Sequence, residues 1–415
     1  MNYFQIIDAK NEIINMLGNN VNNERVLKEV SLYSPRMLKQ ILLAKYISNI
    51  LKANDCLYLL RGNENNSFIN YLLGITNVNP IEYNLPPEMH TIGTLEFECP
   101  SEDIKKLIIK ELKKITPIYN VKNMDNGKLI ELNFKFIIPL IDDLNIPDYS
   151  KLRDISEEYY LIFNLNVNEV LGKIDYFKNE YGLPKYNVCE DNDINYEIFK
   201  SKKIAGLFRS SSINLNFEKL LDRCKEENWN FNTYTYISGA LWMDKAYKLK
   251  DEINDNLIKK YPTTKDTLFN LLVEIGLSVD ESKLVANEIS KKKLFNNNKD
   301  LKEKIPQYLL NYLGDYSYFV SLGHVIAFAK MDYLIMYYKL NAPDFYNVMI
   351  GEYINDLNLI NVFEIKKYCY IYENHKQNAI EDLDTYYYSK LFLEYKNCVE
   401  YKMMKIHRYF KKHIK

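Results

Sequence analysis

The stretch IGTLEFECPSEDIKKLIIKEL, residues 92–112, contains the two kinds of secondary structure that this chain combines. Apolar and polar residues alternate through 92–98, which is typical of a strand with one buried face. Ser101 precedes a segment, 102–114, in which apolar residues recur at helical spacing, and a serine in this place is expected to cap the helix. The stretch therefore predicts a strand followed directly by a helix.

Around this stretch the pattern predicts two further strands, at 129–141 and 159–167, with Pro139 marking an end or an edge of the first. Residues 1–55 are expected to be helical, and nearly all of the chain after the last strand is as well. The strongest helix is expected at 321–340. The sequence therefore predicts an α+β fold that is predominantly helical, in which a small mixed sheet is followed by a large helical part.

Three domains are expected: an α+β domain at 1–170, a helical domain at 171–350 and a C-terminal helical extension with a basic tail at 351–415. With 415 residues, 47% of them hydrophobic, the chain can bury a sizeable core. The formal net charge of −1 means that any basic surface for nucleic acid has to be local.

Several classes of protein are excluded by what the sequence lacks. The six cysteines are scattered without a C-x-x-C pair, so neither a zinc ribbon nor a disulfide framework is expected, and we interpret them as buried thiols. The N-terminus has no basic region followed by an apolar stretch, and no segment approaches the roughly 18 apolar residues that span a bilayer. We therefore expect a cytoplasmic protein without a transmembrane segment.

Four regions, in this order, carry a resemblance to a known family. They are LLAKYISNILKANDCLYLLRGNENNSFINYLLGITNVNP (42–80), the strand and helix of 92–112, DYSKLRDISEEYYLIFNLNV (148–167), and a long helical region (204–350) that includes IAGLFRSSS, FNTYTYISGALW and SLGHVIAFAKMDYLIMYYKL. Together they resemble the palm and fingers of bacterial replicative DNA polymerase III alpha subunits, most closely the PolC type. The chain resembles a truncated, degenerate form of that family, with a palm-like domain of reduced thumb followed by fingers-like helices.

The first region resembles the family's glycine- and serine-rich loop, which holds the triphosphate of the incoming nucleotide. Glycines let backbone N–H groups converge on phosphate in such a loop. Arg61, Gly62 and Ser67 match the loop and are the expected remnant of phosphate binding. Glu64 would place a negative charge beside a phosphate, so the resemblance implies that nucleotide binding is lost. A solvated Arg61 is the alternative.

In the second and third regions the resemblance places the family's three metal-binding aspartates. The aligned positions hold Ile92, Thr94 and Asn164. None of these is a carboxylate, so two-metal catalysis is not expected and no metal or other cofactor is implied.

Glu96 and Glu98 leave an alternative open, because residues two apart in a strand share a face. If the register differs by a few residues, this E-x-E pair could replace the family's D-x-D pair. Only in that case is Mg²⁺ expected.

The fingers-like region keeps Arg209 and His324, which are the expected remnant of the fingers. His324 lies on an apolar helix face and is expected to be a core histidine. The tyrosines of the same helix, Tyr333, Tyr337 and Tyr338, are expected to pack rather than to stack on bases. The C-terminal tail is basic and could bind a phosphate backbone, an anionic membrane surface or an acidic partner, or remain solvated. Its basic residues are Lys402, Lys405, Arg408, Lys411 and Lys412.

The leading hypothesis is a catalytically inactive homologue of a PolC-type polymerase that retains its scaffold to bind primer–template or single-stranded DNA, or a replisome partner or other protein. An active DNA-directed nucleotidyltransferase using Glu96 and Glu98 is one alternative. A protein-interaction module without a nucleic-acid role is the other.

Overall fold

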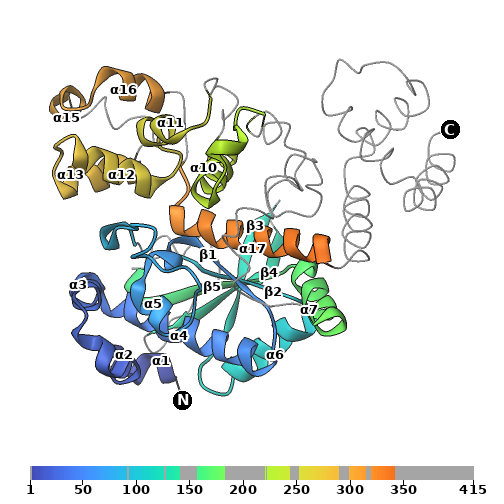
Figure 1. Ribbon diagram of the computed structural model, residues 1–415. Coiled ribbons are helices and arrows are strands. Elements are labelled where there is room, and N and C mark those ends of the chain that lie inside the picture. The colour runs from blue at the N-terminus through green and yellow to red at the C-terminus, as the bar shows by residue number, and fades with distance from the viewer. Residues whose placement is uncertain are drawn as a thin grey trace. The chain divides into compact units, whose positions relative to one another are not determined.

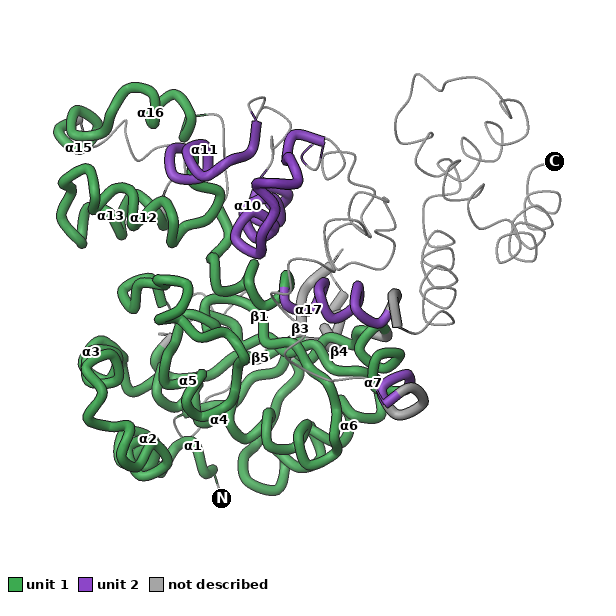
Figure 2. Tube along the Cα trace, viewed as in Figure 1, with its two compact units in different colours: residues 1–176, 261–329 green, residues 177–260, 330–415 purple. Residues whose placement is uncertain are grey.

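The computed structural model describes residues 2–90, 93–125, 128–140, 157–182, 220, 222–243, 252–288, 299–314 and 319–341. The chain divides into two compact units (Figure 2). The first unit comprises Met1–Tyr176 and Tyr261–Ala329, and the second comprises Phe177–Lys260 and Lys330–Lys415.

The first unit begins with a series of helices that the sequence pattern predicts. The long helix α4 starts at Pro35, whose fixed φ suits a first helical position, and the Ser34 side chain accepts a hydrogen bond from Met37 N. The helical elements before the second strand of the chain are α1 (Tyr3–Ile6), α2 (Ala9–Leu17), η1 (Gly18–Asn22), α3 (Glu24–Leu32), α4 (Pro35–Ala53), η2 (Gly62–Asn66), α5 (Phe68–Leu72) and η3 (Pro87–Met89).

A five-stranded mixed sheet forms the centre of the first unit (Figure 1). Its strand order is β1-β2-β5-β4-β3, in which β2 and β5 are parallel and the other neighbours are antiparallel. The strands are β1 (Leu59–Arg61), β2 (Leu95–Cys99), β3 (Tyr119–Asp125), β4 (Lys128–Pro139) and β5 (Tyr160–Val167). The α+β fold class is confirmed, as are the three predicted strands, whereas β1 and β3 were not predicted.

The alternation of residues along β2 and β5 gives the sheet one apolar and one polar face. The apolar face packs against α4 and against α6 (Glu102–Leu112), which Ser101 caps as predicted by accepting a hydrogen bond from Ile104 N (Figure 1). Its strand residues are almost completely buried: Leu95, Phe97, Cys99, Leu161, Phe163 and Leu165. The opposite face of the same strands therefore carries the intervening residues, Glu96, Glu98 and Asn164 among them.

The remaining elements of the first unit follow β5 or lie after residue 260. They are η5 (Glu157–Tyr159), α12 (Lys265–Glu274), α13 (Val279–Glu288), α15 (Lys299–Glu303) and α16 (Gln307–Gly314). Two helices, α7 (Glu169–Tyr181) and α17 (Leu322–Asn341), run from the first unit into the second. The predicted helix at 321–340 is thus confirmed by α17.

In the second unit the described elements are η6 (Glu226–Asn228), α10 (Phe231–Leu241), α11 (Asp255–Lys260) and the later turns of α17. Its described core is aromatic. The Tyr234 hydroxyl donates to Asp332 Oδ2 at 2.7 Å, and the Tyr333 ring lies 5.3 Å from the Tyr234 ring. Tyr333 and Tyr338 are buried, which confirms that they pack inside the protein.

Candidate functional site

The polar face of β2 and β5 brings together Glu96, Glu98 and Asn164, which the sequence singled out, and a further amide, Asn168, which it did not. Glu96 is paired with Asn164 in the parallel register of the two strands. The Asn164 amide donates from Nδ2 to Glu96 Oε1 at 2.9 Å. Glu98 lies two residues along β2 and accepts a hydrogen bond from Asn168 Nδ2 at 2.6 Å. Two carboxylates and two amides therefore share one face of the sheet.

Arg61 lies between these carboxylates, because β1 pairs with β2 so that Arg61 is opposite Glu96. Its guanidinium is 3.5 Å from Glu96 Oε2 and 3.3 Å from Glu98 Oε1. Its Cζ atom also lies 5.7 Å from the centre of the Phe328 ring. We call Arg61, Glu96, Glu98, Asn164 and Asn168 the strand cluster.

Burial sets the electrostatics of the strand cluster. The Glu98 side chain is only 9% exposed, whereas Arg61 and Glu96 are 27% and 30% exposed. Burial raises the pKa of Glu98, and the Asn168 hydrogen bond and the positive charge of Arg61 oppose that rise. Arg61 is thus held by ion pairs on the sheet, which corrects the alternative in which it is solvated. Its guanidinium occupies the place between two carboxylates where a bound cation would compensate them.

The turn between β1 and α5 is buried, although its sequence is almost entirely polar. Asn65, Asn66 and Ser67 are 0% exposed. Such a turn is stable only if its polar groups are hydrogen-bonded inside the protein. The partners come from three distant segments of the first unit.

The first partner is Glu29 of α3, whose carboxylate is completely buried. It accepts hydrogen bonds from Phe68 N at 2.8 Å, Ile69 N at 3.1 Å and Ser67 Oγ at 3.0 Å. Arg25 Nε donates to the same carboxylate at 2.8 Å. We call Glu29, Arg25, Ser67, Phe68 and Ile69 the Glu29 network. The Glu29 carboxylate thus accepts hydrogen bonds from the first two backbone N–H groups of α5.

The second and third partners come from α17 and α12. Gly62 N donates to His324 Nδ1 at 2.9 Å, and His324 is buried. Both observations agree with the predicted core histidine. Asn66 Nδ2 donates to Asp266 Oδ1 at 2.6 Å, and Asp266 also accepts from Leu322 N at the start of α17. Burial raises the pKa of Asp266 to about 6. The turn is therefore fixed against the first residues of α17.

The residues of the expected phosphate-binding remnant consequently have internal partners. The Gly62 N–H is bonded to His324, the Ser67 hydroxyl to Glu29, and Arg61 to the two glutamates. The loss of nucleotide binding that the resemblance implies stays a prediction.

The other expected site residues lie elsewhere. Thr94 precedes β2 and is not part of a strand. Ile92, Arg209 and the basic tail residues Lys402, Lys405, Arg408, Lys411 and Lys412 lie outside the described residues. Among the residues that the structure describes, no group of three or more His, Cys, Asp or Glu side chains is arranged to hold a metal ion.

Glu29 and Asp266 were not found from the sequence, although Glu29 had a detectable signal. In α3 the residues Val26, Val30 and Tyr33 follow helical spacing, and position 29 lies on the same face. A glutamate on an apolar helix face indicates a buried, compensated charge. Asp266 offered no such signal, because its partners are about 200 and 56 residues away.

Comparison with known proteins adds little to this geometry. No protein-family model matches the chain. The chain is similar to a putative BTB/POZ domain-containing protein, L788, of Acanthamoeba polyphaga mimivirus, with 26% identity over 185 residues. The match covers 41% of this chain and 35% of the viral protein, so the chain spans about a third of that relative's length. This similarity does not assign the chain to a family.

In the part of the chain that the structure describes, no helix is both long enough and apolar enough to cross a membrane.

Proposed function

We propose that the chain is a catalytically inactive homologue of the PolC-type DNA polymerases, whose palm-like sheet and fingers-like helices bind DNA or a replication partner. The observation that carries this proposal is a pair of internal charges within the regions that resemble the family's metal-binding strands and nucleotide-binding loop. The Arg61 cation lies between Glu96 and Glu98, and the Glu29 anion accepts from the donors at the start of α5. Arg61 thus supplies a positive charge as a metal ion would, and Glu29 supplies a negative charge as a nucleotide phosphate would.

The strand arrangement supports the same proposal. The two strands that resemble the family's metal-binding strands are β2 and β5, and they are adjacent and parallel. Glu96 and Asn164 are therefore neighbours on the polar face. An amide in the third ligand position carries no charge, which weakens any Mg²⁺ site.

The active nucleotidyltransferase is the competing proposal, and it depends on Arg61. For Glu96 and Glu98 to bind metal, the Arg61 guanidinium would have to leave two carboxylates, one of them nearly buried. A metal ion would therefore have to displace the guanidinium from both ion pairs before it could bind the two glutamates. We therefore favour the inactive homologue.

The proposal predicts DNA binding without synthesis. Affinity for a labelled primer–template should fall by a factor on the order of 10 or more between about 50 and 200 mM salt, because phosphate contacts release counterions. It should not change on addition of Mg²⁺ and deoxynucleotides, and no primer should be extended with Mg²⁺ or Mn²⁺. Template-directed extension that is lost in Glu98→Ala would show that the chain is an enzyme. Absence of binding at every salt concentration would remove the DNA role.

Removal of Arg61 should expose the pair of carboxylates to divalent cations. We expect Arg61→Met to bind Mn²⁺ at pH 7.5 at least about tenfold more tightly than the unchanged protein, because a metal would replace the lost charge. Electron paramagnetic resonance of free Mn²⁺ measures this binding. The matched control is Arg25→Met, which removes an arginine from a single carboxylate, Glu29, and should not create a site. Equal Mn²⁺ binding by both variants would contradict the expectation.

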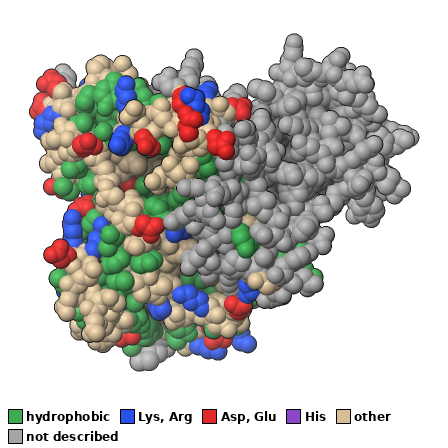
Figure 3. All heavy atoms as spheres, viewed as in Figure 1, with side chains coloured by type: hydrophobic (Ala, Val, Ile, Leu, Met, Phe, Trp, Pro, Cys, Tyr) green, Lys and Arg blue, Asp and Glu red, His purple; other side chains and the backbone are tan. Residues whose placement is uncertain are grey.

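A protein-interaction module is the second candidate, and the charge distribution favours it over DNA binding. The net charge is −1, and on the face shown in Figure 3 the Lys and Arg side chains are interspersed with Asp and Glu. The mimivirus protein to which the chain is similar is named for a BTB/POZ domain and not for a polymerase. Protein partners are therefore the next search if DNA binding is absent.

A further inference from the structure

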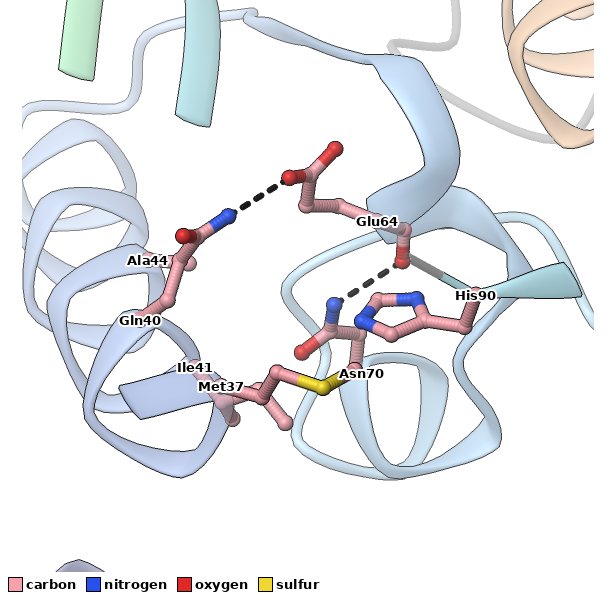
Figure 4. Close-up of a pocket in the computed structure, with 7 residues that line it drawn as sticks. All are labelled: Met37, Gln40, Ile41, Ala44, Glu64, Asn70 and His90. Carbon is pink, nitrogen blue, oxygen red and sulfur yellow. Dashed lines mark hydrogen bonds between the residues drawn. The ribbon is translucent and has the colours of Figure 1, made fainter. Parts of the chain in front are cut away.

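A small pocket lies in the first unit between α4 and the turn that follows β1 (Figure 4). Its volume is about 10 Å³, close to the smallest space that holds one water molecule. The lining residues are Met37, Gln40, Ile41 and Ala44 of α4, together with Glu64, Asn70 and His90. The four polar residues among them are each at most 7% exposed.

The polar atoms that remain available in this pocket are hydrogen-bond acceptors. Gln40 Nε2 donates to Glu64 Oε1 at 2.7 Å, and Asn70 Nδ2 donates to Glu64 O at 2.8 Å. The carbonyl oxygens of the two side chains, Gln40 Oε1 and Asn70 Oδ1, are buried without a hydrogen-bond partner. An occupant of the pocket therefore has to supply donors.

His90 adds another acceptor. Its Nδ1 lies 2.9 Å from the carbonyl oxygen of Asn63, which can only accept, so Nδ1 carries the proton and Nε2 keeps its lone pair. Burial also lowers the pKa of His90, which keeps the ring neutral. Figure 4 shows the His90 ring and the Asn70 amide directed into the space between the turn and α4.

The charges around Glu64 do not compensate a carboxylate. Burial is the main cause that raises its pKa to about 8, and the negative charge of Glu96 on β2 raises it further. Gln40 on α4 and Asn70 on α5 are uncharged, and His90 is neutral. At pH 7.5 a carboxyl group with this pKa is mostly protonated, and a cation bound in the pocket would favour its ionised form.

We propose that this pocket binds a small monovalent cation that donates hydrogen bonds, with ammonium as the fitting species, held by Glu64, Asn70 Oδ1 and His90 Nε2. Gln40 orients the Glu64 carboxylate by its hydrogen bond. Divalent metals are disfavoured, because the pocket offers a single carboxylate. A water molecule fits the same space and leaves Glu64 mostly protonated, whereas a cation stabilises the ionised carboxylate.

The test compares the thermal unfolding midpoint of the full chain in ammonium chloride, sodium chloride and choline chloride at equal ionic strength and pH 7.5. Choline is too large for the pocket. We expect a midpoint at least about 3 °C higher in ammonium than in choline or sodium, as ligand binding to the folded state requires. Equal midpoints in all three salts would overturn the proposal and leave a water molecule as the occupant. An equal rise in sodium and ammonium would also overturn it.

Two variants separate binding in the pocket from general salt effects. In Glu64→Gln the difference between ammonium and choline should disappear, because the carboxylate is lost while its shape is kept. In Glu82→Gln, which removes an exposed carboxylate outside the pocket, the difference should remain. Persistence of the ammonium effect in Glu64→Gln would overturn the assignment of the cation to this pocket. If Glu64→Gln does not fold, the comparison of the three salts in the unchanged protein still tests whether ammonium binds.

Discussion

Replacement of Glu29 by alanine is expected to lower the free energy of unfolding of the first unit by about 4 kcal/mol, because it removes a buried anion from its donors. The Phe68 and Ile69 N–H groups would lose their acceptor inside the protein. The Arg25 guanidinium would lose its ion-pair partner. Urea denaturation followed by far-ultraviolet circular dichroism measures the change.

Glu24→Ala is the matched control, since Glu24 lies on the same helix but is exposed. It should cost about 0.5 kcal/mol, mainly through the loss of a negative charge at the helix N-terminus. Glu29→Gln should fall between the two variants, because it keeps one acceptor oxygen but faces the remaining donors with an NH₂ group. If Glu29→Ala costs no more than Glu24→Ala, the Glu29 network does not hold the turn in place.

The strands that could be predicted are those with a buried face. The segments 92–98, 129–141 and 159–167 match β2, β4 and β5 to within a few residues, because apolar residues alternate along them. The two missed strands, β1 and β3, are at the edges of the sheet. In β1, which is three residues long, the consecutive residues Leu59 and Leu60 are both buried, so the segment shows no alternation that would indicate a strand.

The strand cluster could be predicted only in part. The sequence indicates that Glu96 and Glu98 share a face and that Asn164 lies on another strand. It does not indicate that Arg61 pairs with both glutamates, because that contact depends on the register of two antiparallel strands about 35 residues apart. The sequence therefore identified Arg61 as a candidate ligand of phosphate, whereas its partners are two carboxylates of its own sheet.

The buried turn was hardest to interpret from the sequence, since Asn and Ser in a row are usually a sign of exposure. Here Asn65, Asn66 and Ser67 are buried because their polar groups meet acceptors and donors from distant segments. Such compensation is a property of the tertiary structure. The same polar composition would occur in a solvated loop.

Gly323→Ala is expected to lower the free energy of unfolding of the first unit by about 2 kcal/mol, although alanine is favoured over glycine inside a helix by about 1 kcal/mol. A Cβ atom at this position would lie 2.2 Å from Asn66 Oδ1 and 3.1 Å from the Asn65 carbonyl carbon. The Asn66 side chain cannot easily move away, since its Nδ2 donates to Asp266. The start of α17 would therefore have to move away from the turn between β1 and α5. Urea denaturation measures the loss.

Gly314→Ala, at the end of α16, is the control for helix propensity, because nothing lies within 4 Å of its Cβ position. It should be neutral or stabilise the first unit by up to about 1 kcal/mol. The two glycines thus separate propensity, which favours alanine at both positions, from close packing, which opposes it only at Gly323. If Gly323→Ala stabilises the protein as Gly314→Ala does, α17 does not lie against the turn, and the hydrogen bond from Gly62 N to His324 loses its support as well.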